Sequence, residues 1–187
     1  FTLVDLIDGY TRTGFRPVAT VPASWQPVLA RVVAPPVSGM VPPGAQVMGI
    51  LNLTPDSFSD GGLNAKTEQA VATGLQYCAQ GAGLLDLGGE STRPGAKHVT
   101  PQQEWGRLAQ AVATWRAQAP QAVLSIDTRN SVVMEQALNA GADVINDVSA
   151  LMHDPQSLPL LAGHNCGVML MHMRGTPQTM AEHTQYK

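Results

Sequence analysis

The 187-residue sequence has little charge and few aromatic side chains: 13% of its residues are charged and 5% are aromatic. Lys and Arg form no run, and the formal net charge is −3. This distribution excludes the basic surface that nucleic-acid binding requires. No apolar stretch is as long as a transmembrane helix, so we expect no membrane partner. The 44% of hydrophobic residues indicates a folded globular interior.

Cysteine is also scarce, with only Cys78 and Cys166 in the sequence. Asp5 and Asp8 interrupt the first apolar segment, which argues against a secretory signal. We therefore expect reduced thiols packed in the core and a cytoplasmic protein. The five histidines share no metal-ligand spacing, which argues against a zinc site.

Residues 1–44 contain seven prolines and no motif that indicates a function. Frequent proline opposes long helices and central strands. We therefore expect an N-terminal extension that is mostly irregular, with at most a short hairpin and with Trp25 packed under the main domain. Residues 45–187 are expected to form that domain.

From residue 46 onward, short apolar segments alternate with amphipathic ones. The apolar segments are residues 47–51, 84–87, 123–126, 144–145 and 167–171, and the helical ones are residues 66–80, 101–119, 131–140 and 155–162. Thr100 with Gln103 predicts a capping box before the second helix, and Gly141 a left-handed cap after the third. Strands that alternate with helices predict a parallel α/β sheet.

Two architectures fit this alternation: a doubly wound sheet and a TIM (β/α)8 barrel. The doubly wound sheet requires a glycine-rich turn after its first strand, and Asn52-Leu53-Thr54-Pro55 stands there instead. Polar residues follow every strand, as they do at the catalytic face of a barrel. The sequence therefore predicts the first five βα units of a TIM barrel. Five strands leave two open edges, so we expect the chain expressed alone to self-associate.

The polar strand ends supply the candidate ligand-binding residues. Asp127 could cap a helix, or its carboxylate could accept two parallel hydrogen bonds from the amino-amidine edge of a pterin or guanine. Asn146 can donate to and accept from the same ring. Met171 and Met173 share a face, where a thioether could pack on a flat heterocycle, although core packing is the alternative.

Two loops add further candidates. Phe58 is an aromatic residue in the polar loop after Asn52, where it either contacts a substrate or packs back into the core. Arg93 lies in Gly-Gly-Glu-Ser-Thr-Arg-Pro-Gly-Ala, residues 88–96, a composition that suits an anion-binding loop. A hard cation such as Mg²⁺, held by phosphate oxygens and one Asn or Asp, fits these residues better than zinc does.

Residues 48–62, 86–96, 125–128, 145–147 and 170–173 together resemble dihydropteroate synthases, the folate-pathway transferases. The resemblance covers about residues 46–187, and the motifs ending in Asp-Ser-Phe-Ser-Asp-Gly-Gly and in Arg-Pro-Gly-Ala are long and specific. The resemblance implies condensation of p-aminobenzoate with hydroxymethyl-dihydropterin pyrophosphate, with loss of pyrophosphate before the amine attacks. It also implies inhibition by sulfonamides and a homodimer when the barrel is complete.

The resemblance also implies roles for eight residues. Asp127 and Asn146 are expected to bind the pterin, with Met171 near its face. Asn52 is expected at the Mg²⁺–pyrophosphate site, Thr92 and Arg93 near the pyrophosphate, and Phe58 and Pro94 in the p-aminobenzoate pocket. On this reading Asp127, Arg93 and Asn52 carry the catalysis, and Asn52 is the metal ligand.

Two alternatives remain open at this stage. A pterin-binding methyltransferase uses a related barrel but does not need the loops that contain Phe58 and Arg93. The other alternative is an inactive half-barrel, because the family's C-terminal Asp, Lys and Arg-x-His residues have no counterpart in this sequence.

Overall fold

The computed structural model describes residues 3–8, 11–33, 46–54, 63–91, 99–175, 179 and 185. Contacts divide the chain into two compact units, Phe1–Val37 and Ser38–Lys187. Within the described ranges, no helix is both long and apolar enough to cross a membrane.

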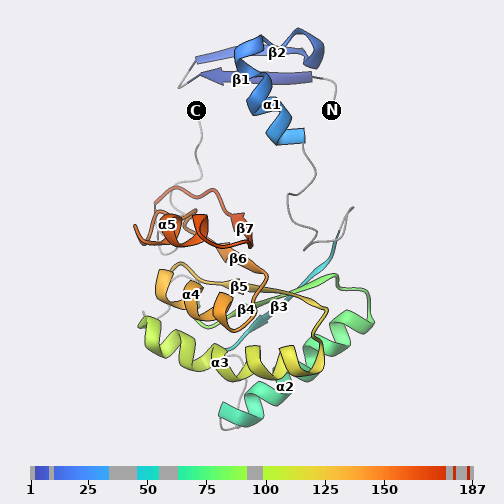
Figure 1. Ribbon diagram of the computed structural model, residues 1–187, viewed down its shortest axis with the longest axis vertical. Helices are drawn as coiled ribbons and strands as arrows, with labels where there is room; N and C mark the ends of the chain where they lie inside the picture. The colour runs from blue at the N-terminus through green and yellow to red at the C-terminus, as the bar shows by residue number, and fades with distance from the viewer. Residues whose placement is uncertain are drawn as a thin grey trace. The chain divides into compact units, whose positions relative to one another are not determined.

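The first unit contains an antiparallel hairpin followed by helical turns (Figure 1). Its elements are β1 (Leu3–Asp8), β2 (Thr11–Pro17), two 3₁₀ turns (Val18–Thr20 and Ala23–Trp25) and α1 (Gln26–Val33). The predicted hairpin is confirmed, but the expectation of a mostly irregular segment is wrong. Pro27 is the second residue of α1, where a missing N–H costs nothing, so proline here starts a helix instead of breaking one. The packing of Trp25 under the main domain stays a prediction.

The second unit is built on a five-stranded parallel sheet in which the strands follow one another in sequence order (Figure 1). The strands are β3 (Met48–Asn52), β4 (Leu84–Gly88), β5 (Val123–Asp127), β6 (Val144–Asp147) and β7 (Gly167–Leu170). A doubly wound sheet would reverse its strand order at a switch point. The unbroken order confirms the prediction of consecutive barrel units.

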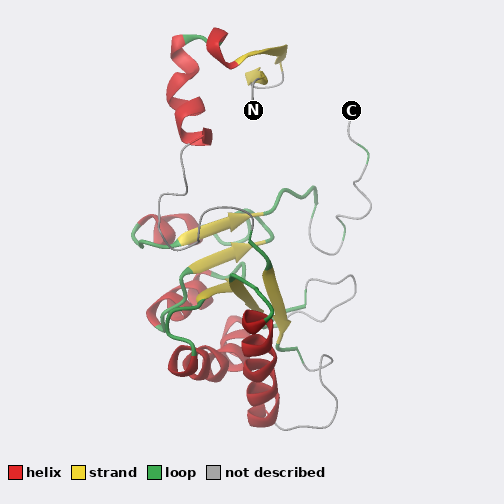
Figure 2. Ribbon diagram, turned by 90° about the vertical axis from the view of Figure 1, so that its right-hand side faces the viewer, coloured by secondary structure: helices red, strands yellow, loops and turns green. Residues whose placement is uncertain are grey.

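Four helices connect these strands and lie on the same side of the sheet (Figure 2). They are α2 (Leu63–Ala79), α3 (Pro101–Gln118), α4 (Ser131–Asn139) and α5 (Ser157–Ala162). The predicted capping box is present, because Thr100 Oγ1 accepts from the Gln103 N–H and the Gln103 side chain accepts from the Thr100 N–H. Gly141 has a φ of 100°, as predicted for the residue that ends the α4 segment.

Alternate strand residues face the helices and form the core. The helix-facing side chains are Leu51, Leu85, Leu87, Leu124, Ile126 and Ile145, all buried with α2, α3 and α4. The residues between them face the concave side of the sheet. On the described part of the sheet, β3 and β7 are the edges, and Ile50 and Leu170 on them are 58% and 56% exposed. The self-association expected from open edges stays a prediction.

Candidate functional site

The register of the sheet places the predicted strand-end residues in one row on its concave side. Asn52 lies opposite Gly88, Gly88 opposite Asp127, and Asp127 opposite Asn146. Met169 continues the row beyond Asn146. Asn52 and Asn146, which are 94 positions apart in the sequence, thus line one edge. The structure therefore brings together three of the predicted site residues: Asn52, Asp127 and Asn146.

Gly88 is the residue that keeps this row open. A Cβ at Gly88 would lie 3.0 Å from Asn52 Oδ1 and 3.5 Å from Asp127 Oδ2. Glycine therefore leaves a space bordered by an amide oxygen and a carboxylate oxygen. The amide oxygen of Asn52 is a hard donor, which suits Mg²⁺ when phosphate oxygens and water complete its coordination.

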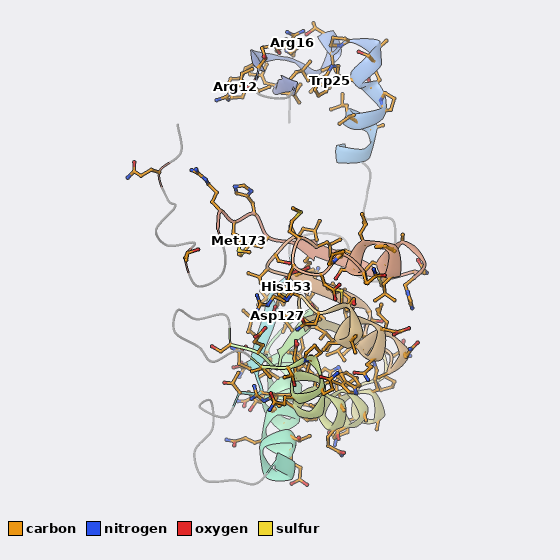
Figure 3. The ribbon with its side chains drawn as sticks, turned by 90° about the vertical axis from the view of Figure 1, so that its left-hand side faces the viewer. Arg12, Arg16, Trp25, Asp127, His153 and Met173 are labelled. Carbon is orange, nitrogen blue, oxygen red and sulfur yellow. The ribbon has the colours of Figure 1, made fainter. Side chains whose placement is uncertain are left out.

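The Asp127 carboxylate lies at the carboxyl end of β5, on the side from which the strand-end loops extend (Figure 3). None of the hydrogen bonds found among the described residues involves its carboxylate. It does not cap the following helix, because Asn130 occupies the N-cap of α4 and the Ser131 N–H bonds to Asp154. The helix-capping interpretation of Asp127 is therefore wrong, and its oxygens are free to accept hydrogen bonds from a ligand.

Burial raises the pKa of Asp127 to about 7, and negative neighbours add to this effect. These neighbours are Asp86, Glu104, Asp147 and Glu90, in decreasing order of effect. An acceptor in such surroundings gains more from a ligand with two N–H donors than it would in water.

Asp86 orients Asn146 from the neighbouring strand. The buried Asp86 carboxylate accepts from Ser125 Oγ at 2.6 Å and from Asn146 Nδ2 at 3.0 Å. Because the amide nitrogen of Asn146 faces Asp86, its carbonyl oxygen and second N–H hydrogen remain for a ligand. Burial also raises the pKa of Asp86, and the two hydrogen bonds oppose that rise.

A second layer of charged residues lies behind Asp127. Arg129 forms two hydrogen bonds with Glu90, from Nε at 3.1 Å and from Nη2 at 3.2 Å. Arg107 Nη1 donates to the Gly89 carbonyl at 2.6 Å, which ties α3 to the residues that follow β4. These contacts fix the backbone on both sides of the Asp127 carboxylate.

The other predicted site residues are not part of this row of strand ends. Phe58, Thr92, Arg93 and Pro94 lie outside the described residues. Met171 follows β7 and is 37% exposed, and its N–H bonds to the Asp147 carbonyl. By alternation, Met171 shares the concave side with Met169, and Figure 3 shows Met173 further along this segment, beyond the strand. The contact of Met171 with a pterin stays a prediction.

The Mg²⁺ ion predicted at Asn52 stays a prediction. The described residues contain no group of three or more His, Cys, Asp or Glu side chains arranged to hold a metal ion. The two thiols are free, and Cys78 and Cys166 are partly buried against the core.

A family model described as pterin binding enzyme matches residues 48–187. This chain belongs to the pterin-binding enzyme family. The match begins at β3, the first strand of the sheet, and includes every strand of the concave row. The resemblance inferred from the motifs is confirmed.

Known members of the pterin-binding family that are similar to this chain are dihydropteroate synthases. The Neisseria meningitidis serogroup B enzyme is 47% identical over 148 residues, covering 76% of this chain and 50% of that protein. A Xanthomonas albilineans dihydropteroate synthase structure with 4-aminobenzoic acid is 49% identical, with a TM-score of 0.65, covering 70% of this chain and 47% of that one. An Anaplasma phagocytophilum structure with bound 6-hydroxymethylpterin-monophosphate is 38% identical, with a TM-score of 0.64, covering 70% and 49%. This pterin-binding chain thus spans about half the length of the relatives it matches.

Several residues that shape the row of strand ends have no role in the predictions from the sequence. Asp86 has a visible signal, because a carboxylate at the centre of Leu84-Leu85-Asp86-Leu87 needs a buried partner. Gly88 lies in a glycine pair, which gives no indication of which glycine borders the site. Glu104 and Asn130 belong to a helix and to a helix cap, and no local pattern distinguishes them from surface residues.

Proposed function

We propose that this chain forms the pterin site of a dihydropteroate synthase. The enzyme condenses p-aminobenzoate with hydroxymethyl-dihydropterin pyrophosphate and releases pyrophosphate. The observation that carries the proposal is the Asp127 carboxylate, which faces the open space at Gly88 and lies opposite Asn146 in the sheet. Family membership and the similar dihydropteroate synthases support it.

In this proposal, Asp127 accepts two hydrogen bonds from the amino-amidine edge of the pterin. Asn146, held by Asp86, offers its carbonyl oxygen to a neighbouring ring donor. Met171 packs near the ring face. The charge on Asp127 also offsets the positive charge that develops on the pterin methylene as pyrophosphate departs.

The pyrophosphate end of the substrate is assigned to Asn52, Thr92 and Arg93, and the p-aminobenzoate pocket to Phe58 and Pro94. Mg²⁺, when bound beside Asn52, would neutralise charge on the leaving pyrophosphate. Asn52 Oδ1, which borders the space at Gly88, suits such a cation. No strong nucleophile is needed, because the amine attacks only after the leaving group has departed. The homodimer and the cytoplasmic location belong to the same proposal.

Calorimetric titration of the full-length protein with hydroxymethyl-dihydropterin pyrophosphate and Mg²⁺ tests the proposal. Gly88→Ala places a methyl group against Asn52 and Asp127, so we expect affinity to fall by about tenfold or more. The matched control is Gly106→Ala on α3, where a Cβ meets open space. Unaltered affinity in Gly88→Ala, or no binding by the unmodified protein, would contradict the proposal.

A further inference from the structure

Glu104 is a buried acid to which the proposed mechanism gives no role. It projects from α3, and 0% of its surface is exposed. Its Oε2 accepts from Asn130 Nδ2 at 2.6 Å, and the Asn130 N–H in turn bonds to Thr128 Oγ1 at 3.2 Å. Glu104 thus connects α3 to the turn that follows Asp127.

The second carboxyl oxygen of Glu104 is not accounted for. Oε1 is buried, and no donor among the described residues bonds to it. Leaving such an atom unpaired is unfavourable, so buried polar atoms normally find a protein or water partner. The missing partner must fit the space next to Oε1.

A small cleft next to Glu104 offers that space. It is lined by Glu90, Glu104, Asp127, Thr128, Arg129 and Val148. Its volume is about 10 Å³, which is room for about one water molecule. A buried water requires two or more polar partners, and the carboxyl groups of Glu104 and Asp127 both line this cleft.

We propose that one water molecule in this cleft joins Glu104 to Asp127, which makes Glu104 a positioning residue for the pterin-binding carboxylate. The water donates one hydrogen to Glu104 Oε1 and the other to one oxygen of Asp127. Each Asp127 oxygen has two lone pairs, so both oxygens can still accept from the two donors of the ligand. The functional part of this inference rests on the proposed pterin site.

Among the negative neighbours of Asp127, Glu104 is the most suitable one to substitute, because the others form ion pairs or several hydrogen bonds. Glu90 is paired with Arg129, Asp86 accepts from Ser125 and Asn146, and Asp147 accepts from Ser149 and the Leu151 N–H. Glu104 accepts from the neutral Asn130 and lies beside the neutral Thr128, and the opposite charges of Glu90 and Arg129 have smaller effects on it. Glu104 is also among the groups that raise the pKa of Asp127, and burial raises its own pKa.

Glu104→Gln tests the functional link without disturbing the helix, because the side chains have the same shape. Binding of 6-hydroxymethyl-7,8-dihydropterin, which has no titrating phosphate, is measured by calorimetry between about pH 5.5 and 8.5. In the unmodified full-length protein we expect affinity to fall as the pH drops through about 7, where Asp127 gains a proton. In Glu104→Gln the loss of a negative neighbour moves this midpoint down by about 0.5 pH unit or more.

Glu135→Gln is the matched control, since it removes the same charge from an exposed position on α4. Its midpoint should equal that of the unmodified protein. An unchanged midpoint in Glu104→Gln overturns the inference, because a purely structural glutamate would behave in that way.

A high-resolution crystal structure of the unmodified protein supplies the second test. We expect one water within about 2.7–3.2 Å of both Glu104 Oε1 and an Asp127 oxygen. An empty cleft, or a water that contacts only one of the two, overturns the inference. If no variant binds the pterin at any pH, the proposed function fails instead, and the crystal structure still decides whether the water is present.

Discussion

Removing one side of the ion pair between Arg129 and Glu90 should be among the most destabilising single substitutions in the sheet unit. Both guanidinium–carboxylate hydrogen bonds are formed, at 3.1 and 3.2 Å, between side chains that are 12% and 8% exposed. Arg129→Met keeps the length of the side chain and removes its charge and both hydrogen bonds. The buried carboxylate of Glu90 then loses the guanidinium of Arg129 and keeps the hydrogen bond from the Val99 N–H.

The expected loss follows from this burial. Breaking a buried ion pair from one side costs about 3–5 kcal/mol, because the remaining charge has lost its water and its oppositely charged neighbour. Glu90 keeps the hydrogen bond from the Val99 N–H, so we expect a loss near the lower end of this range. Two hydrogen bonds to a charged group, at about 1.5–3 kcal/mol each, lead to the same range. A typical domain is stable by about 5–15 kcal/mol, so Arg129→Met should remove a third or more of the stability.

Urea denaturation of the single and double variants measures this effect. Glu90→Gln removes the other charge, so the double variant should lose less than the sum of the single losses by about 1 kcal/mol or more. A loss below about 1 kcal/mol in Arg129→Met, with additive effects, would refute the reasoning. Such a result would show that water screens the pair as it screens surface ion pairs.

Two further predictions concern packing and pH. Gly74→Ala on α2 places a Cβ 2.5 Å from Leu85 Cδ1 and 2.9 Å from Trp115 Cζ3, so its free energy of unfolding should fall by about 1–3 kcal/mol. Gly106→Ala meets no neighbour, so its free energy of unfolding should rise by up to about 1 kcal/mol. Thermal unfolding measures both variants, and equal effects would contradict the packing. For Asp127, the folded-state pKa of about 7 lies above the ordinary aspartate pKa of 3.8, so the folded state favours the protonated form. The free energy of unfolding therefore falls as the pH rises through about 7. Asp127→Asn should therefore be more stable than the unmodified protein at pH 8 by about 1–3 kcal/mol and equal to it near pH 4, as judged by urea denaturation without ligand; a variant less stable at pH 8 would contradict the raised pKa.

The sequence alone determined the architecture of the sheet unit and the family. Apolar segments followed by polar residues predicted five parallel strands with ligand-binding ends, because the carboxyl ends of parallel strands meet at one edge. Asn52, Asp127 and Asn146 were found in this way, and the structure places all three in one row. The proline content led to the wrong prediction of a mostly irregular N-terminal segment. Proline interrupts a helix in its interior but is tolerated in its first turn, as at Pro27 in α1.

Tertiary structure decided which side chains act on those three residues. Asp86 and Asn146 are 60 residues apart, and Glu90 and Arg129 are 39 apart. Their hydrogen bonds depend on strand register and on helix packing, which no local pattern encodes. The same holds for Gly88, whose missing side chain matters only because Asn52 and Asp127 border it from the two neighbouring strands. The sequence thus identified the groups that would meet a ligand, and only the packed sheet showed how Asp86 orients Asn146 and where Glu104 approaches Asp127.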